Sequence, residues 1–154
     1  MPRSSPLVYI AGPLFNESER AFNVRLCDLV ESMGFRSFLP QREAGDAAAR
    51  ISRGEPPDVV RSEIFELDWT AVRDCDMLLL VLDGRVPDEG GCVELGMAFA
   101  LGKPCIGFQT DSRRFSGGFN NAMIDGCLKG RTASDWDGLG RLLEHQLNSS
   151  GFGL

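Results

Sequence analysis

Short apolar runs alternate along the chain with segments in which apolar residues recur at helical spacing. The apolar runs cover residues 7–11, 35–39, 77–82 and 105–108, and each is followed by glycine, proline or polar residues. The helical pattern covers residues 16–33, 58–74, 91–101 and 134–147. Strands that alternate with helices predict right-handed β-α-β crossovers and a parallel sheet.

Helix ends are predicted from residues that can cap them. Asn16 followed by Glu19 forms a capping-box pattern, and Asp58 and Ser134 are expected to cap two later helices. Val59 is expected on the inward stripe of its helix. Residues 41–57 are expected to form a long loop with a short helix at 47–51.

The pattern favours one α/β domain over residues 1–154 with a flavodoxin-like, Rossmann-like architecture. We expect a doubly wound parallel sheet of five strands in the order 2-1-3-4-5, with helices on both faces. In that order the first and third strands are neighbours at the switch point, where such folds hold ligands. Tyr9 and Gly12 on one side then face residues 83–94 on the other.

Composition narrows the class of partner. The 154 residues carry a net charge of -6 and no basic stripe, which disfavours nucleic-acid polymers. The five cysteines form no C-x-x-C pair, and no stretch approaches the ~20 apolar residues that span a bilayer. We expect a cytoplasmic protein with reduced thiols that does not bind membranes.

Familiar cofactor and metal patterns are missing from the sequence. Neither a G-x-x-x-x-G-K-[ST] loop nor a G-x-G-x-x-G turn is present, so nucleotide phosphates have no glycine cradle. The single histidine, His145, lies on the last amphipathic segment and is expected to be a surface or structural residue. The sequence implies no cofactor and no metal.

Glu94 is the residue most indicative of chemistry. It lies in the stretch DEGGCVELG, where an acidic loop and a glycine pair lead into an otherwise apolar helical turn beside the carboxyl end of the 77–82 strand. The helix dipole there favours an ionised carboxylate, which a covalent glycosyl mechanism requires of its nucleophile. The alternative is that Glu94 only complements the dipole at a solvated first turn.

Other candidates each have an ordinary structural explanation. Tyr9, the only tyrosine, needs a hydroxyl partner if buried, either a carboxylate across the switch point or a backbone group. Asp88 can cap the following helix, and Asp68 can lie on a solvated helix face. Phe15 can stack on a planar ligand or close the core.

Four segments in combination resemble the nucleoside 2-deoxyribosyltransferase family. They are YIAGPLF (9–15), IFELDWTAVRDCD (64–76), PDEGGCVELGMAFALGKPCI (87–106) and FNNAMIDG (119–126). The resemblance implies transfer of a 2-deoxyribosyl group between nucleobases by double displacement through a glutamyl ester, with retained configuration. It also implies a role in purine and pyrimidine salvage.

The resemblance assigns roles to the candidate residues. Glu94 corresponds to the nucleophile and Tyr9 to the tyrosine that orients it. Asp68 and Asp88 correspond to aspartates near the base and sugar, and Phe15 to an aromatic wall of the base pocket. A carboxyl group near the base could hold or relay the proton that the leaving base needs.

The resemblance also implies a pocket shared between subunits. Asn121, or the adjacent Asn120, resembles an asparagine that a neighbouring subunit places near the sugar 5′-hydroxyl, which favours nucleosides over nucleotides. The protein would then be a homo-oligomer built from dimers, up to a hexamer. Gln41 follows the second strand and is expected to contact the base.

Two other functions remain open on the sequence. A 2′-deoxyribosidase would use the same glutamate to hydrolyse nucleosides or nucleotides. It would differ from the transferase only in that water, and not a second base, cleaves the glutamyl ester. A non-catalytic flavodoxin-like module would use the acidic loop to bind a small ligand or a protein. The missing flavin phosphate loop weighs against that module.

Overall fold

The computed structural model describes residues 5–111, 113 and 118–149 and contains one five-stranded parallel sheet in the predicted order, β2-β1-β3-β4-β5. The strands are β1 (Leu7–Ala11), β2 (Arg36–Phe38), β3 (Met77–Val81), β4 (Cys105–Phe108) and β5 (Thr132–Ala133). Tyr9 pairs in register with Phe38 on one side and Leu78 on the other. The predicted α/β fold and strand order are confirmed, and β1 and β4 have the predicted bounds.

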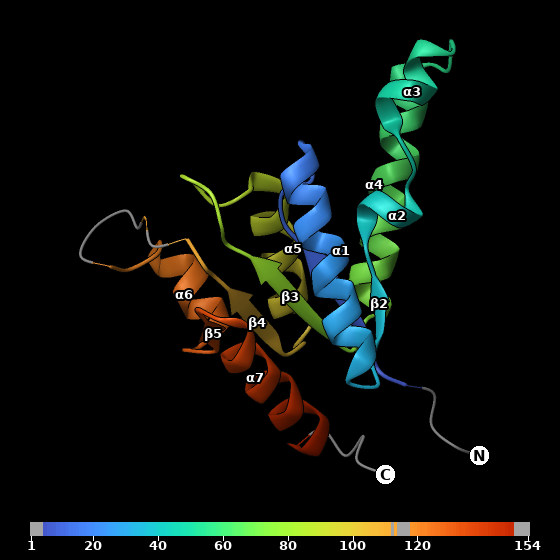
Figure 1. The fold of residues 1–154 in the computed structure, drawn as a ribbon. Helices are drawn as coiled ribbons and strands as arrows, with labels where there is room; N and C mark the ends of the chain where they lie inside the picture. The colour runs from blue at the N-terminus through green and yellow to red at the C-terminus, as the bar shows by residue number, and fades with distance from the viewer. Residues whose placement is uncertain (1–4, 112, 114–117, 150–154) are drawn as a thin grey trace.

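Seven helices lie among the described residues. They are α1 (Glu17–Ser32), α2 (Pro40–Glu43), α3 (Ala47–Ser52), α4 (Pro57–Asp74), α5 (Glu89–Ala100), α6 (Ala122–Leu128) and α7 (Trp136–Ser149). Figure 1 shows α1 and α7 on one side of the sheet and α5 on the other. The helix pair α3 and α4 projects beyond the sheet at the upper right of that view.

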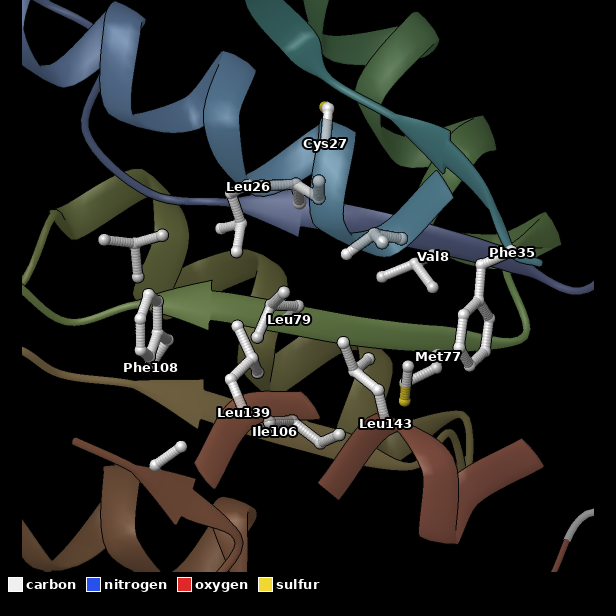
Figure 2. Packing of buried hydrophobic residues seen from close by; sticks show 14 of the residues in the cluster. Val8, Leu26, Cys27, Phe35, Met77, Leu79, Ile106, Phe108, Leu139 and Leu143 are labelled. Atoms are coloured by element: carbon white, nitrogen blue, oxygen red, sulfur yellow. The ribbon is translucent and has the colours of Figure 1, made fainter. Parts of the chain in front are cut away.

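The sheet separates two hydrophobic cores. Successive side chains of a strand point to opposite faces, so Val8 and Ile10 join the core under α1 and α7. Figure 2 shows Val8 in this core. Tyr9 joins the other core, with residues of α4, α5 and α6. All five residues of β3 are buried, as expected for a central parallel strand covered on both faces.

The start of α1 follows the sequence prediction. The Asn16 side chain accepts a hydrogen bond of 2.9 Å from the Glu19 amide, and the Glu19 carboxylate accepts one of 3.2 Å from the Asn16 amide. Gly34, with a φ of 93°, follows the end of the helix. Together these residues fix the course of the chain between β1 and β2.

Three predictions about helix starts and faces are wrong. Helix α4 begins at Pro57, so Asp58 lies inside the helix and does not cap it. Proline suits the first helical position because the backbone N–H that it lacks would have no hydrogen-bond partner there. Val59 is 49% exposed instead of inward-facing. At α7, Asp135 and not Ser134 accepts the capping bond, 2.7 Å from the Gly138 amide.

The segment expected to be a long loop is more ordered than predicted. In addition to the short helix α3, residues Pro40–Glu43 form helix α2, again with proline in the first turn. Arg50 of α3 bonds the carboxylate of Glu55 at 2.7 Å and also pairs with Glu63 of α4. The pair with Glu63 joins α3 to α4, and the pair with Glu55 joins α3 to the residues just before α4.

Candidate active site

Tyr9 and Glu94 form the centre of the candidate site. Tyr9 is fully buried in β1, and its ring stacks on Phe38 with centroids 5.2 Å apart. Its hydroxyl donates a hydrogen bond of 2.9 Å to Glu94 Oε1 of α5. Of the two kinds of partner considered for this phenol, the carboxylate is the one present, and burial together with Glu94 raises the pKa of Tyr9.

Close packing of two glycines brings α5 onto the sheet. A Cβ on Gly91 would lie 2.8 Å from Leu80 Cδ1 and 3.4 Å from the Gly12 nitrogen. Gly12 itself has a φ of 146°, and a Cβ there would lie 2.8 Å from Val81 Cβ. The first turn of α5 thus rests directly on the ends of β1 and β3, which puts Glu94 within reach of Tyr9.

Asp88 fixes the start of that helix. Its Oδ2 accepts a hydrogen bond of 2.7 Å from the Gly91 amide, the capping role considered from the sequence. Its charge is also near enough to raise the pKa of Glu94. Asp88 therefore both positions Glu94 and makes its ionisation harder.

Glu94 is protonated more readily than the sequence suggested. Burial raises its pKa to about 8, and the charges of Asp68 and Asp88 add to the effect, whereas the Tyr9 hydrogen bond opposes it. Burial therefore opposes the ionisation that the helix dipole is expected to favour.

Asp68 supplies a second unusual carboxyl group. It lies on α4, and burial raises its pKa to about 6, although Tyr9 lowers it. Its Oδ1 is buried and has no hydrogen-bond partner among the described residues. A buried oxygen without a partner is costly, so this atom is available to a ligand N–H or to a proton.

A cavity of about 220 Å³ opens between α4 and α5 beside these carboxyl groups. Its polar side chains are Asp68 and Glu94, and the rest of its wall is Phe65, Trp69, Val72, Gly90, Val93 and Met97. A small, mostly apolar cavity with a few converging polar groups is typical of a ligand site. Asp68 and Glu94 therefore face one common space.

The remaining predicted site residues lie elsewhere in the chain. Phe15 is 72% exposed at the turn before α1. Gln41 donates a 3.0 Å bond to the Arg20 carbonyl and accepts one of 3.0 Å from Asn23, which connects α2 to α1. Neither residue lines the cavity beside Glu94.

The two asparagines take different positions. Asn121 is the N-cap of α6 and accepts a 2.9 Å bond from the Met123 amide, whereas Asn120 exchanges hydrogen bonds with Gln109. Both line a separate cavity of about 470 Å³, whose wall also includes Val86 and Pro87. Within one chain, therefore, Asn121 and Glu94 do not share a cavity.

Two aromatic residues of the cavity wall, Phe65 and Trp69, were not expected from the sequence. They lie four residues apart on α4, on either side of Asp68 in the sequence. The sequence signal that could have indicated them is the i, i+4 spacing of two aromatic residues next to an acid, since residues at this spacing lie on one face of a helix.

Three further features of the described ranges concern metal ligands, membrane spans and His145. In residues 5–111, 113 and 118–149, no group of three histidine, cysteine or acidic side chains is placed to hold a metal ion. None of the helices in these ranges has the length and apolar character needed to cross a membrane. His145 is exposed on α7, as expected.

Taken together, the fold and the site define a flavodoxin-like α/β protein with a tyrosine-bound glutamate at the switch point of its sheet. Comparison with known proteins gives the family. The sequence profile of the nucleoside 2-deoxyribosyltransferase family matches residues 8–150, and the chain belongs to this family. The resemblance found in the sequence is confirmed.

Individual relatives agree at the level of fold. A conserved protein from Enterococcus faecalis V583 superposes with a TM-score of 0.77, at 26% identity, over 93% of this chain and 99% of that one. A 2-deoxyribosyltransferase from Bacillus psychrosaccharolyticus gives a TM-score of 0.71 at 24% identity, over 87% and 90% of the two chains. A CMP N-glycosidase from Clostridium botulinum shares the fold at 18% identity, with a TM-score of 0.56, over 92% of this chain and 98% of that one.

A curated relative is similar in sequence over part of its length. An uncharacterized protein of Schizosaccharomyces pombe is 32% identical over 119 residues, which cover 74% of this chain. The match spans only 54% of that relative's own length. The family profile and the solved structures thus agree on the nucleoside 2-deoxyribosyltransferase family and on its fold.

Proposed function

We propose that the protein transfers a 2-deoxyribosyl group between nucleobases of 2′-deoxynucleosides through a covalent ester on Glu94. The observation that carries the proposal is the Tyr9–Glu94 hydrogen bond of 2.9 Å at the wall of a cavity that Asp68 also lines. A glycosyl transfer with a covalent intermediate needs a fixed carboxylate nucleophile and a nearby proton donor. These residues supply both.

The two carboxyl groups share the protons that the reaction needs. With pKa values of about 8 for Glu94 and about 6 for Asp68, the pair binds one proton at neutral pH. When that proton lies on Asp68, Glu94 is the nucleophile and Asp68 is the acid. By these pKa values the shared proton lies mostly on Glu94, so the reactive form is the one in which that proton has moved to Asp68.

The first displacement then balances as follows. A Glu94 oxygen bonds to C1′ as the C1′–N bond breaks, and the electron pair of that bond leaves with the base, which takes the proton of Asp68. The Tyr9 hydroxyl holds the glutamate in line. An incoming base attacks C1′ from the other face, loses its proton to Asp68 and releases Glu94, so two inversions retain the configuration.

The other predicted residues enter as contacts to substrate. Asp88 lies near the sugar, Gly12 lets the backbone approach it, and Phe15 and Gln41 border the base from the α1 side. Asn121 reaches the 5′-hydroxyl of a nucleoside bound in a neighbouring subunit, so the active form is a homo-oligomer. Its separation from Glu94 within one chain supports this arrangement.

Hydrolysis is the second candidate, and one observation favours it. Phe65 and Val93, on the rim of the cavity, are 55% and 57% exposed in the single chain. Water can therefore reach an ester on Glu94 unless a neighbouring subunit covers the rim. Exclusion of water decides between transfer and hydrolysis.

A base-exchange assay tests the proposal. Thymidine and adenine incubated with the protein should give deoxyadenosine and thymine, and Glu94→Gln should abolish the reaction. Free deoxyribose in place of deoxyadenosine would establish the hydrolase instead. No turnover of any deoxynucleoside would contradict both enzymatic readings.

A further inference from the structure

A buried side chain of α1 ties together the two loops that carry the proposed base contacts. The first loop joins β1 to α1 and carries Phe15, and the second follows β2 and leads to Gln41 in the first turn of α2. Asn23 lies inside α1 and is 3% exposed. Its Nδ2 donates a hydrogen bond of 3.0 Å to the Pro13 carbonyl and another of 3.0 Å to Gln41 Oε1. Both N–H groups of this amide therefore bridge the two loops.

Asparagine is an unfavourable residue at this position unless the bridge is needed. It is a poor helix former, and a buried amide must make hydrogen bonds to offset its removal from water. The first loop is also held by another residue of α1, since the Phe15 amide donates a hydrogen bond of 2.8 Å to Glu19 Oε2. What the Asn23 side chain adds is the connection to Gln41.

Backbone carbonyls at the two ends of this hydrogen-bond chain fix the orientation of both amide groups. A carbonyl oxygen only accepts, so the Pro13 carbonyl must face Asn23 Nδ2. For the same reason the Arg20 carbonyl must face Gln41 Nε2, which lies 3.0 Å from it. Gln41 Oε1 is then turned toward Asn23, which meets it with its second N–H. The Gln41 amide keeps one N–H and one oxygen lone pair for a ligand, in one fixed orientation.

We propose that Asn23 is a positioning residue for base recognition, because it sets the orientation in which the Gln41 amide meets the edge of the base. The inference rests on the proposed function, in which Gln41 borders the base. A glutamine amide can pair with an acceptor and a donor that lie side by side on a base edge, as in bidentate contacts to adenine. Turning the amide over would exchange its donor and its acceptor. Asn23 itself touches neither the base nor the reacting atoms and acts through Gln41.

Asn23→Asp tests this role with almost no change in side-chain size. A carboxylate offers only acceptors, so Gln41 must either lose this contact or turn over and lose its bond to the Arg20 carbonyl. KM for deoxynucleoside donors should rise by about tenfold with kcat nearly unchanged, because Gln41 contacts the base alike in the bound substrate and in the transition state. The neutral variant Asn23→Ala should raise KM in the same direction, and it serves as the test if the aspartate variant fails to fold.

A double-mutant cycle with Gln41→Ala separates this role from a purely structural one. If Asn23 acts through Gln41, Asn23→Asp should raise KM by less than about twofold in the Gln41→Ala protein. Leu26→Val is the matched control for stability, because Leu26 lies on the same helix and is fully buried in the core under α1 and α7. It should lower the unfolding temperature and leave KM unchanged.

Calorimetric titration with adenine supplies a readout that needs no turnover. Adenine has no sugar to transfer, so its binding can be measured in a protein with Glu94 intact. Asn23→Asp should weaken this binding by about tenfold, and Leu26→Val should leave it unchanged.

The outcomes separate the inference from the proposed function. Normal base exchange with an unchanged KM in both Asn23 variants would overturn the inference alone. A rise in KM confined to the aspartate variant would show an effect of its charge, and an equal rise in the Gln41→Ala protein would show that Asn23 does not act through Gln41. Either result would overturn the inference, as would a raised KM in Leu26→Val.

Absence of turnover in the unchanged protein would contradict the proposed function. The adenine titration would then decide the inference. Weaker binding in both Asn23 variants would support it, whereas equal binding, or no binding to the unchanged protein, would overturn it.

Discussion

The Tyr9 hydroxyl donates a 2.9 Å hydrogen bond to Glu94, although the two residues are 85 positions apart in the chain. This bond opposes the burial that raises the pKa of Glu94 to about 8. Tyr9 therefore increases the ionised fraction of the proposed nucleophile as well as fixing its orientation. It acts as a positioning residue through Glu94.

Tyr9→Phe should lower kcat/KM by about 10–100-fold, the usual effect of losing a hydrogen bond to a charged group. Tyr9 lowers the pKa of both Glu94 and Asp68, so without the hydroxyl both limbs of the pH profile should move upward. The ring still stacks on Phe38, and the thermal unfolding temperature should change little. An unshifted pH profile would show that Tyr9 has only a structural role.

The dependence of activity on pH should follow the single proton that Glu94 and Asp68 share. The value of kcat/KM should rise as pH increases through about 6, where the pair loses its first proton, and fall through about 8, where it loses the proton that Asp68 gives to the base. Steady-state rates between pH 5 and pH 9 would measure both limbs in about half-unit steps. A profile without a falling limb near pH 8 would contradict the raised pKa of Glu94.

Stability should also depend on the ionisation of Glu94. The folded-state pKa of about 8 lies above the ordinary value of 4.5 for a glutamate, so the folded protein binds more protons than the unfolded chain between those two values. The free energy of unfolding should therefore fall as pH rises toward 8. Glu94→Gln keeps the size of the side chain but removes the charge, and should be more stable than the unchanged protein by about 1–3 kcal/mol at pH 8.

Denaturant melts of both proteins at pH 5 and pH 8 would measure this difference. The two proteins should unfold at similar denaturant concentrations at the lower pH and diverge at the higher one. Equal stability at both pH values would mean that Glu94 ionises without cost in the fold.

Gly12→Ala should destabilise the protein by about 1–3 kcal/mol and reduce activity. A Cβ at Gly12 would lie 2.8 Å from Val81 Cβ, and the φ of 146° disfavours any residue with a side chain. Gly45→Ala is the matched control, since Gly45 also has a positive φ, 70°, but nothing within 4 Å of the added atom. A larger loss in the control would mean that backbone strain, and not the packing of β1 against β3, dominates.

The sequence predicts the framework well because its signals are local. The run 7–11 is closed by Gly12-Pro13, and residues 77–82 are too apolar for an exposed strand, so both strands and their neighbouring positions could be expected. The starts of α4 and α7 were misplaced because several residues near each start can cap a helix or begin one. Only the tertiary position of the chain selects Pro57 and Asp135.

The candidate site was predictable in part. The proximity of Tyr9 and Glu94 follows from the strand order, which makes β1 and β3 neighbours. The raised pKa of Glu94 could not be predicted, because it depends on how deeply α5 rests on the sheet and on Asp68 arriving from α4. The aromatic wall was missed for the same reason, since the partners of Phe65 and Trp69 across the cavity come from another helix.

The covalent intermediate is the claim on which the account depends, and mass spectrometry can detect it directly. A deoxynucleoside donor without an acceptor base, quenched rapidly in acid and digested, should leave one deoxyribosyl residue on the peptide that contains Glu94. The same treatment of Glu94→Gln should leave none. Turnover by the unchanged protein with no adduct, or with the adduct on another residue, would contradict the account.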